Sequence, residues 1–136
     1  MCLFTSQPAE IAVKPIIVYK VLVLTPAKEY STPCQGNIVK VNDILKASVH
    51  TEPTEIHINN KSIFVIEGEG VHAYTSKAFA KQTHFFYYVI TKWEIPAGAK
   101  YWLGIDECEG EIAATEMKFI KVCEDLTSFS IPFLRG

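Results

Sequence analysis

The sequence predicts a β-rich α+β fold: a single domain with about six or seven mostly antiparallel strands and one or two short helices. Three observations support this prediction. Residues 16–24 and 86–95 are long runs of branched and aromatic side chains, which favour strands. Helical patterns are short, and the clearest covers residues 75–81. The chain of 136 residues has the size of one domain and shows no repeat and no linker.

Composition narrows the class of protein. Hydrophobic residues make up 49% and charged residues 21% of the chain, which excludes wholesale disorder. No apolar run approaches the roughly 18 to 20 residues of a membrane span, so no membrane partner is expected. A net charge of −2 argues against duplex nucleic acid as a partner. Among the 13 basic residues only Arg135 is an arginine, so lysines or backbone N–H groups would have to recognise phosphate.

The ends of the chain and its cysteines suggest a compartment. Within the one domain, 1–136, we expect residues 1–14 to form an N-terminal segment and residues 123–136 a C-terminal tail. The first residues lack the charged region and apolar run of a secretory signal. The four cysteines form no CxxC motif and no metal-type pairing; they are Cys2, Cys34, Cys108 and Cys123. We therefore expect reduced thiols in a cytoplasm, with no metal and no cofactor.

The first half of the chain predicts a central strand at residues 16–24, a loop at 25–37 and a short strand at 38–41. One helical turn at 42–45 and a hairpin of residues 55–58 with 62–66 follow. The central strand follows Pro15 and is closed by a Thr-Pro step. Asn42 and Asp43 are residues that cap a helical turn. Asn59 and Asn60 separate two β-favouring runs and would form the hairpin turn.

The second half predicts a short helix at residues 76–81, the second long strand at 86–95 and a turn into a further strand at 96–103. A solvated acidic loop at 106–111 and a last strand at 112–122 follow. Thr75 or Ser76 would cap the helix, whose apolar side is formed by residues 78–80. From Val89 to Ile95 the strand 86–95 alternates, which places four residues on one face: Val89, Thr91, Trp93 and Ile95.

Polar groups gather where the short helix begins. His72 follows a Gly-Glu-Gly step and is followed by Tyr74, Thr75 and Ser76. The first N–H groups of a helix, together with hydroxyls, can bind an anion. The alternative is an ordinary helix cap beside a surface histidine. A second candidate is the loop at Tyr30 and its neighbours, where an aromatic ring and hydroxyls could contact a nucleobase, although the same residues also make ordinary turns.

The remaining candidates are weaker. The aromatic residues from 85 to 102 belong mostly to core packing, but rings on both faces of one strand also suggest an oligomer interface or a stacking platform. The acidic run at residues 107–111 is typical of a solvated turn. Glu116 lies inside the last predicted strand, and an edge position explains it more simply than catalysis does.

An ordered series of short motifs resembles a family of small proteins from tailed bacteriophages and their hosts. The series comprises YKVL at 19–22, GVHAYTS at 70–76 and IPAGAKYW at 95–102, and the resemblance extends over roughly residues 16 to 122. The family includes the anti-CBASS "sponge" proteins. The resemblance implies an immune-evasion protein that sequesters a cyclic dinucleotide such as cyclic GMP–AMP without cleaving it. It also implies a homo-oligomer, with a tetramer favoured, in the cytoplasm of the infected host.

The resemblance and the polar segments together define a candidate ligand site. It would form where three segments converge: the strand at Tyr19, the loop at Tyr30 and the turn from His72 to Lys77. The complete set is Tyr19, Lys20, Tyr30, Ser31, His72, Tyr74, Thr75, Ser76, Lys77 and Trp102. Two departures from the family pattern bear on it. Thr32 is an additional residue in the loop, and the shortage of arginine leaves phosphate to Lys20, Lys77 or the backbone.

Two other functions remain open at this stage. The order of elements is vaguely similar to that of ADP-ribosyltransferases. The protein would then be a degenerate enzyme of this kind, with Tyr74, Ser76 and Glu116 as its catalytic set, or a binder of NAD-type ligands. That family places an Arg or His on its first strand, whereas this strand offers Tyr19 and Lys20. The third function is a phage protein-interaction module that uses its aromatic surface and binds no small ligand.

Overall fold

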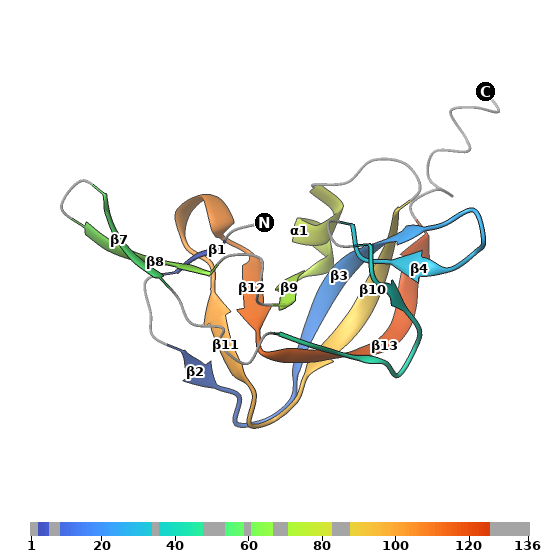
Figure 1. The fold of residues 1–136 in the computed structure, drawn as a ribbon, viewed down its shortest axis with the longest axis horizontal. Coiled ribbons are helices and arrows are strands. Elements are labelled where there is room, and N and C mark those ends of the chain that lie inside the picture. Colours follow the sequence, from blue (N-terminus) through green and yellow to red (C-terminus); the bar gives the residue numbers. More distant parts are fainter. Residues whose placement is uncertain are drawn as a thin grey trace.

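The computed structural model describes residues 3–5, 9–33, 36–47, 54–58, 61–66, 71–82 and 88–125 (Figure 1). The predicted β-rich architecture of antiparallel strands with a short helix is confirmed. The number of strands was underestimated, because the described residues form thirteen, several of them only two or three residues long. In this part of the chain no helix is long and apolar enough to cross a membrane.

The strands form two sheets. The larger has the order β2–β11–β12–β9–β3–β10–β13–β6, and two short strands, β4 and β5, extend it from β3. Their bounds are Glu10–Ile11 (β2), Ile16–Leu24 (β3), Tyr30–Ser31 (β4), Ile38–Val39 (β5), Ile44–Lys46 (β6), Val71–Tyr74 (β9), Tyr88–Ile95 (β10), Lys100–Leu103 (β11), Glu111–Ala114 (β12) and Glu116–Asp125 (β13). The smaller sheet has the order β1–β8–β7, with bounds Leu3–Thr5, Lys61–Ile66 and Thr54–Ile58.

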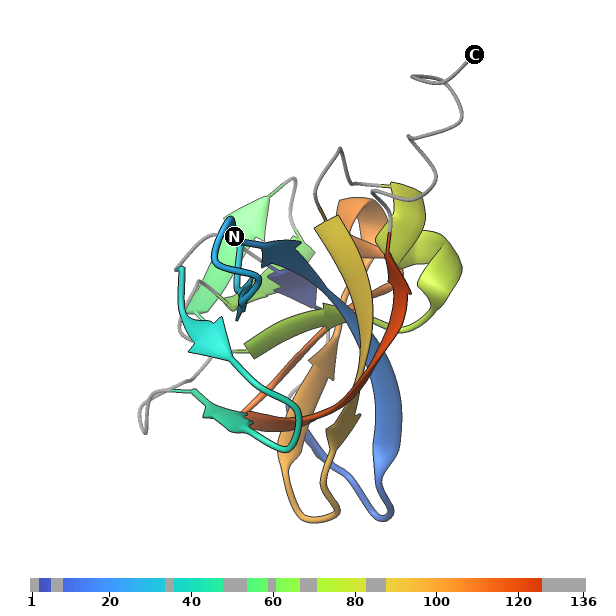
Figure 2. The same ribbon diagram turned by 90° about the vertical axis from the view of Figure 1, so that its right-hand side faces the viewer.

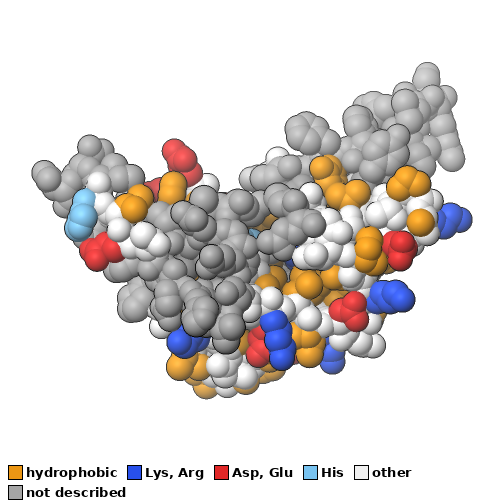
Figure 3. Space-filling model, viewed as in Figure 1, with side chains coloured by type: hydrophobic (Ala, Val, Ile, Leu, Met, Phe, Trp, Pro, Cys, Tyr) orange, Lys and Arg blue, Asp and Glu red, His pale blue; other side chains and the backbone are white. Residues whose placement is uncertain are grey.

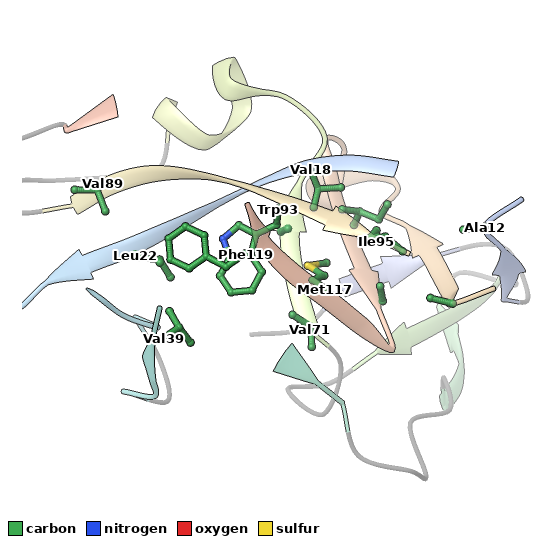
Figure 4. Packing of buried hydrophobic residues seen from close by; sticks show 14 residues of the cluster. Ala12, Val18, Leu22, Val39, Val71, Val89, Trp93, Ile95, Met117 and Phe119 are labelled. Atoms are coloured by element: carbon green, nitrogen blue, oxygen red, sulfur yellow. The ribbon is translucent and has the colours of Figure 1, made fainter. Parts of the chain in front are cut away.

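The larger sheet curls around the main core, as Figure 2 shows for the bent strands β3, β10 and β13. The predicted alternation in β10 is confirmed, because Val89, Trp93 and Ile95 lie in this core and Thr91 is fully buried between them. At its centre the rings of Trp93 and Phe119 stack with centroids 4.9 Å apart (Figure 4). Two register shifts between β10 and β13 are irregularities of the kind that bend a strand pair.

The outer face of the sheet carries two smaller clusters. One lies beneath the helix α1 (Lys77–Gln82) and contains Val21, Ala80 and Ile90. The other lies beside β1 and the short 3₁₀ helix η1 (Asp106–Cys108), and contains Leu3, Trp102, Cys108 and Ala113. Small helical elements therefore cover parts of a sheet whose opposite face forms the main core.

Three local predictions were wrong. Residues 42–45 are not a helical turn. Asn42 has a φ of 79°, and the Lys40 N–H donates to Oδ2 of Asp43 at 2.8 Å, so a side-chain-closed turn leads into β6. The predicted last strand is in fact two strands, β12 and β13, which are interrupted at Thr115. The Thr115 N–H donates to the carbonyl of Lys100. The acidic segment includes η1, and its Cys108 is buried.

The positions of turns were predicted more accurately than the pairing of the strands beside them. Residues 96–98 do form a turn, with Gly98 at a φ of 90°. The strands on either side of it are not a hairpin, because β10 already pairs with β3 and β13, and β11 pairs with β12 and β2. The hairpin at 55–58 and 62–66 is confirmed as the antiparallel pair β7–β8. Cys108 and Cys123 are free thiols, as expected; Cys2 and Cys34 lie outside the described residues.

Candidate functional site

Two tyrosines from distant parts of the sequence meet on the outer face of the sheet. Tyr19 in β3 and Tyr74 in β9 are directly opposite each other in the ladder between these strands. Both are half-buried and pack against the cluster beneath α1. Cross-strand partners project from the same face of a sheet, so the two residues form one aromatic surface. We call this pair the tyrosine platform.

A positive charge lies beside the platform. Lys77 is the first residue of α1 and is exposed, and its Nζ lies 6.0 Å from the centroid of the Tyr19 ring. At this distance an exposed ammonium is attracted to the face of the ring by about 0.5–1 kcal/mol. Three residues of the predicted set, Tyr19, Tyr74 and Lys77, therefore do come together.

The two predicted hydroxyls are engaged within the fold. The Thr75 N–H and Oγ1 both donate to the carbonyl of Gly110, at 2.8 and 3.2 Å. The Ser76 Oγ accepts a hydrogen bond from the N–H of Phe79 at 3.2 Å, which makes Ser76, of the two candidates Thr75 and Ser76, the cap of the helix. These groups position the start of α1 and thereby position Lys77. A helix of six residues offers little dipole for binding an anion.

Lys20 and Tyr30 lie on the opposite face of the sheet from the tyrosine platform. Lys20 is directly opposite the buried Thr91, and its Nζ donates to the carbonyl of His72 at 2.7 Å. The Tyr30 ring packs edge-on against Phe119 in the main core, with centroids 6.1 Å apart. Ser31 is buried in β4. The structure therefore does not bring the first-strand lysine and the loop tyrosine into one site with the platform.

His72 lies on the outer face in β9, two residues before Tyr74, and Trp102 lies on the same face two strands further across the sheet. In register, Trp102 of β11 is opposite Ala113, which is in turn opposite His72 of β9. Trp102 is 1% exposed, in the cluster with Leu3 and Cys108. Its indole Nε1 is buried and has no hydrogen-bond acceptor among the described residues. The Trp102 ring is therefore enclosed in this cluster and does not offer a face to a ligand.

Sequence reasoning missed a carboxylate that lies next to the platform in the sheet. Glu111 is directly opposite Tyr74 and is half-buried. Burial raises the pKa of Glu111, and a hydrogen bond with the Cys108 thiol opposes that rise. Burial likewise raises the pKa of Cys108. The position of Glu111 after Gly110 suggested only a solvated turn, because its strand partner is far away in the sequence.

The residues proposed for ADP-ribosyltransferase chemistry are not assembled. Tyr74 lies opposite Glu111, whereas Glu116 lies beyond the break at Thr115, opposite Lys46 of β6. Glu116 is half-buried and its strand β13 lies between β10 and β6, so the edge position expected for it is wrong. In the described residues no group of three His, Cys, Asp or Glu side chains could hold a metal ion.

Comparison of the chain with protein-family models, with curated proteins and with solved structures gave no significant match. The assignment of a function therefore rests on the residues of this chain.

Proposed function

We propose that this protein binds a nucleotide ligand without altering it, and that the ligand is a cyclic dinucleotide, as the motif resemblance implies. The observation that carries the proposal is the tyrosine platform with the Lys77 ammonium beside it. Base stacking on an aromatic ring and a nearby positive charge are the two interactions that a nucleobase and its phosphate need. The role proposed for the bound state is sequestration of an immune signal in the infected host cell.

The chemistry of the platform favours binding over catalysis. The hydroxyls of Thr75 and Ser76 are held by backbone groups, so they are not placed as nucleophiles. The carboxylate of Glu111 beside Tyr74 would repel a phosphate. A ligand that stacks its base on Tyr74 and directs its phosphates toward Lys77 avoids that repulsion. This orientation is part of the proposal.

The test is calorimetric titration of cyclic GMP–AMP and related cyclic dinucleotides into the wild type, Tyr19→Leu and Tyr74→Leu. A stacking ring contributes about 1–3 kcal/mol per base, so each variant should bind roughly ten- to a hundredfold more weakly. Tyr101→Leu is the matched control, since Tyr101 contacts Glu10 at another part of the sheet. Lys77→Ala should weaken binding less and reduce its salt dependence. Lys14→Ala, at an exposed lysine in the connection between β2 and β3, should do neither.

Two further outcomes separate the alternatives. Ligand released by heating should be recovered intact; a cleaved dinucleotide, or product formed from NAD, would favour an enzyme. Absence of both heat and thermal stabilisation with every nucleotide would overturn the proposed function. Equal loss of affinity in the Tyr101 control would show that the variants act through stability instead of contact.

A further inference from the structure

The hairpin β7–β8 projects from the body of the protein (Figure 1). In the small sheet it is joined to the rest of the molecule through β1, which pairs with β8. We call residues 54–58 and 61–66 the arm. Among the strands that the structure describes, the other edge of the arm is β7, which ends the order β1–β8–β7. An edge strand presents a row of backbone N–H and C=O groups that can pair with another strand.

The sequence of β7 is Thr-Glu-Ile-His-Ile, and its central residue is Ile56. Glu55 and His57 on either side of it are exposed, and Ile56 is half-buried. Figure 3 shows an acidic and a histidine side chain at the surface of the arm. Edge strands of monomers are commonly protected by lysine, proline, other charged side chains, a bulge or a covering segment. β7 contains no lysine or proline, its pairing with β8 has no register shift, and its one charged residue is Glu55.

Two copies of β7 are complementary to each other when they run antiparallel about a two-fold axis through Ile56. Glu55 of each copy then lies opposite His57 of the other, and Ile56 lies opposite itself. In an antiparallel ladder alternate residues direct their backbone groups to the same side. An axis through a residue pairs these outward-directed residues with each other, whereas an axis between two residues does not. Axes through Glu55 or His57 would instead place like residues opposite each other.

We propose that β7 is a self-association surface: two copies of this chain pair their β7 strands antiparallel about Ile56 and join their two three-stranded small sheets, β1–β8–β7, into one continuous six-stranded sheet. The contact is isologous, as a two-fold dimer requires. The favourable groups are the outward backbone hydrogen bonds, two symmetric Glu55–His57 pairs and the central Ile56 contact. This interface is distinct from the tyrosine platform and does not depend on any ligand.

The test is sedimentation velocity of the ligand-free protein over a concentration series from about 1 to 500 μM. The wild type should show a monomer–dimer equilibrium. His57→Glu should weaken the dimer about tenfold or more, because it places two carboxylates opposite each other at two symmetric positions. Glu55→Lys removes the carboxylate that faces His57 and should weaken the dimer less. The double variant Glu55→Lys/His57→Glu places a lysine opposite a glutamate in every pair and should restore the dimer.

A covalent readout tests the register. Ile56→Cys should form an inter-chain disulfide under mild oxidation, because directly opposite strand residues lie within disulfide distance. Thr54→Cys should not, since it would lie opposite Ile58 of the other copy. The wild type controls for the native cysteines, and circular dichroism controls for folding. A monomer at every concentration, or a dimer that the double variant fails to restore, would overturn the proposal.

Discussion

Gly110 is the contact point between the turn that precedes β12 and the helix α1. Its φ is 87°, and a Cβ atom at this position would lie 2.4 Å from two ring carbons of Phe79. Its carbonyl also accepts both hydrogen bonds of Thr75. A side chain here therefore meets two separate costs: an unfavourable backbone conformation and an overlap with an aromatic ring. The substitution Gly110→Ala tests both of them.

The magnitude can be divided with a matched glycine. Gly98 also has a positive φ, of 90°, but a Cβ there would meet nothing within 4 Å. Gly98→Ala should therefore cost only the backbone part, about 1–2 kcal/mol. Gly110→Ala should cost that amount and, in addition, about 1–3 kcal/mol for the overlap with Phe79. The expected loss of unfolding free energy is about 2–5 kcal/mol.

Urea denaturation followed by tryptophan fluorescence measures these values, because Trp93 and Trp102 are both buried. The double variant Phe79→Ala/Gly110→Ala removes the overlapping ring. It should be more stable than the sum of the two single losses predicts, with a coupling of about 1 kcal/mol or more. If Gly110→Ala costs no more than Gly98→Ala, or if the two changes at Gly110 and Phe79 are additive, the proposed contact does not limit this position.

Two further predictions concern polar groups. The Thr91 hydroxyl donates to the Lys20 carbonyl at 2.5 Å and accepts a hydrogen bond from the Trp93 indole N–H at 2.7 Å. Thr91→Val should therefore lower the unfolding free energy, measured by urea denaturation, by about 1–3 kcal/mol. An unchanged unfolding free energy would contradict this prediction. The Tyr101 hydroxyl donates to Oε2 of Glu10 at 2.6 Å, and this bond, followed by burial and the Glu10 charge, raises the pKa of Tyr101 above 10.0. The stabilisation of the folded state by this hydrogen bond is present below pH 10 and is lost as the pH rises through the pKa of Tyr101 in the folded protein. In Glu10→Gln, ultraviolet titration should therefore show Tyr101 ionising at a lower pH than in the wild type. An unchanged Tyr101 transition would refute the role of Glu10.

The sequence predicted elements better than it predicted their neighbours. The period of two in β10 is local, so the core positions from Val89 to Ile95 followed from the sequence alone. The break at Thr115 was not visible, because the segments on either side are both β-favouring and only their partners differ. Likewise, the turn at Gly98 has a local signature, but the pairing of β11 depends on which strand edges are already occupied.

The candidate site shows the same limit. The cap of α1 was predicted to be Thr75 or Ser76, because capping involves residues close in the sequence, and the structure shows that it is Ser76. The same period of two that predicts strands also separates Tyr19 from Lys20, and the structure places them on opposite faces. The meeting of Tyr19 with Tyr74, and of Tyr74 with Glu111, depends on the order of strands in the sheet. Residues 85–87, which contributed to the predicted aromatic surface, lie outside the described residues.

The attachment of the arm to the body has a consequence for how the chain reaches its final form. β1 pairs with β8 such that Leu3 lies opposite Ile66, whereas β7 and β8 pair across a short connection. Hairpin formation needs little loop closure, but joining β1 to β8 must close a long loop first. During synthesis β1 emerges well before its partner β8. Leu3 and Thr5 are fully buried in the folded protein but are exposed to solvent until β8 has been made. We expect assembly of the small sheet to be a late folding step, during which these residues are most vulnerable to aggregation.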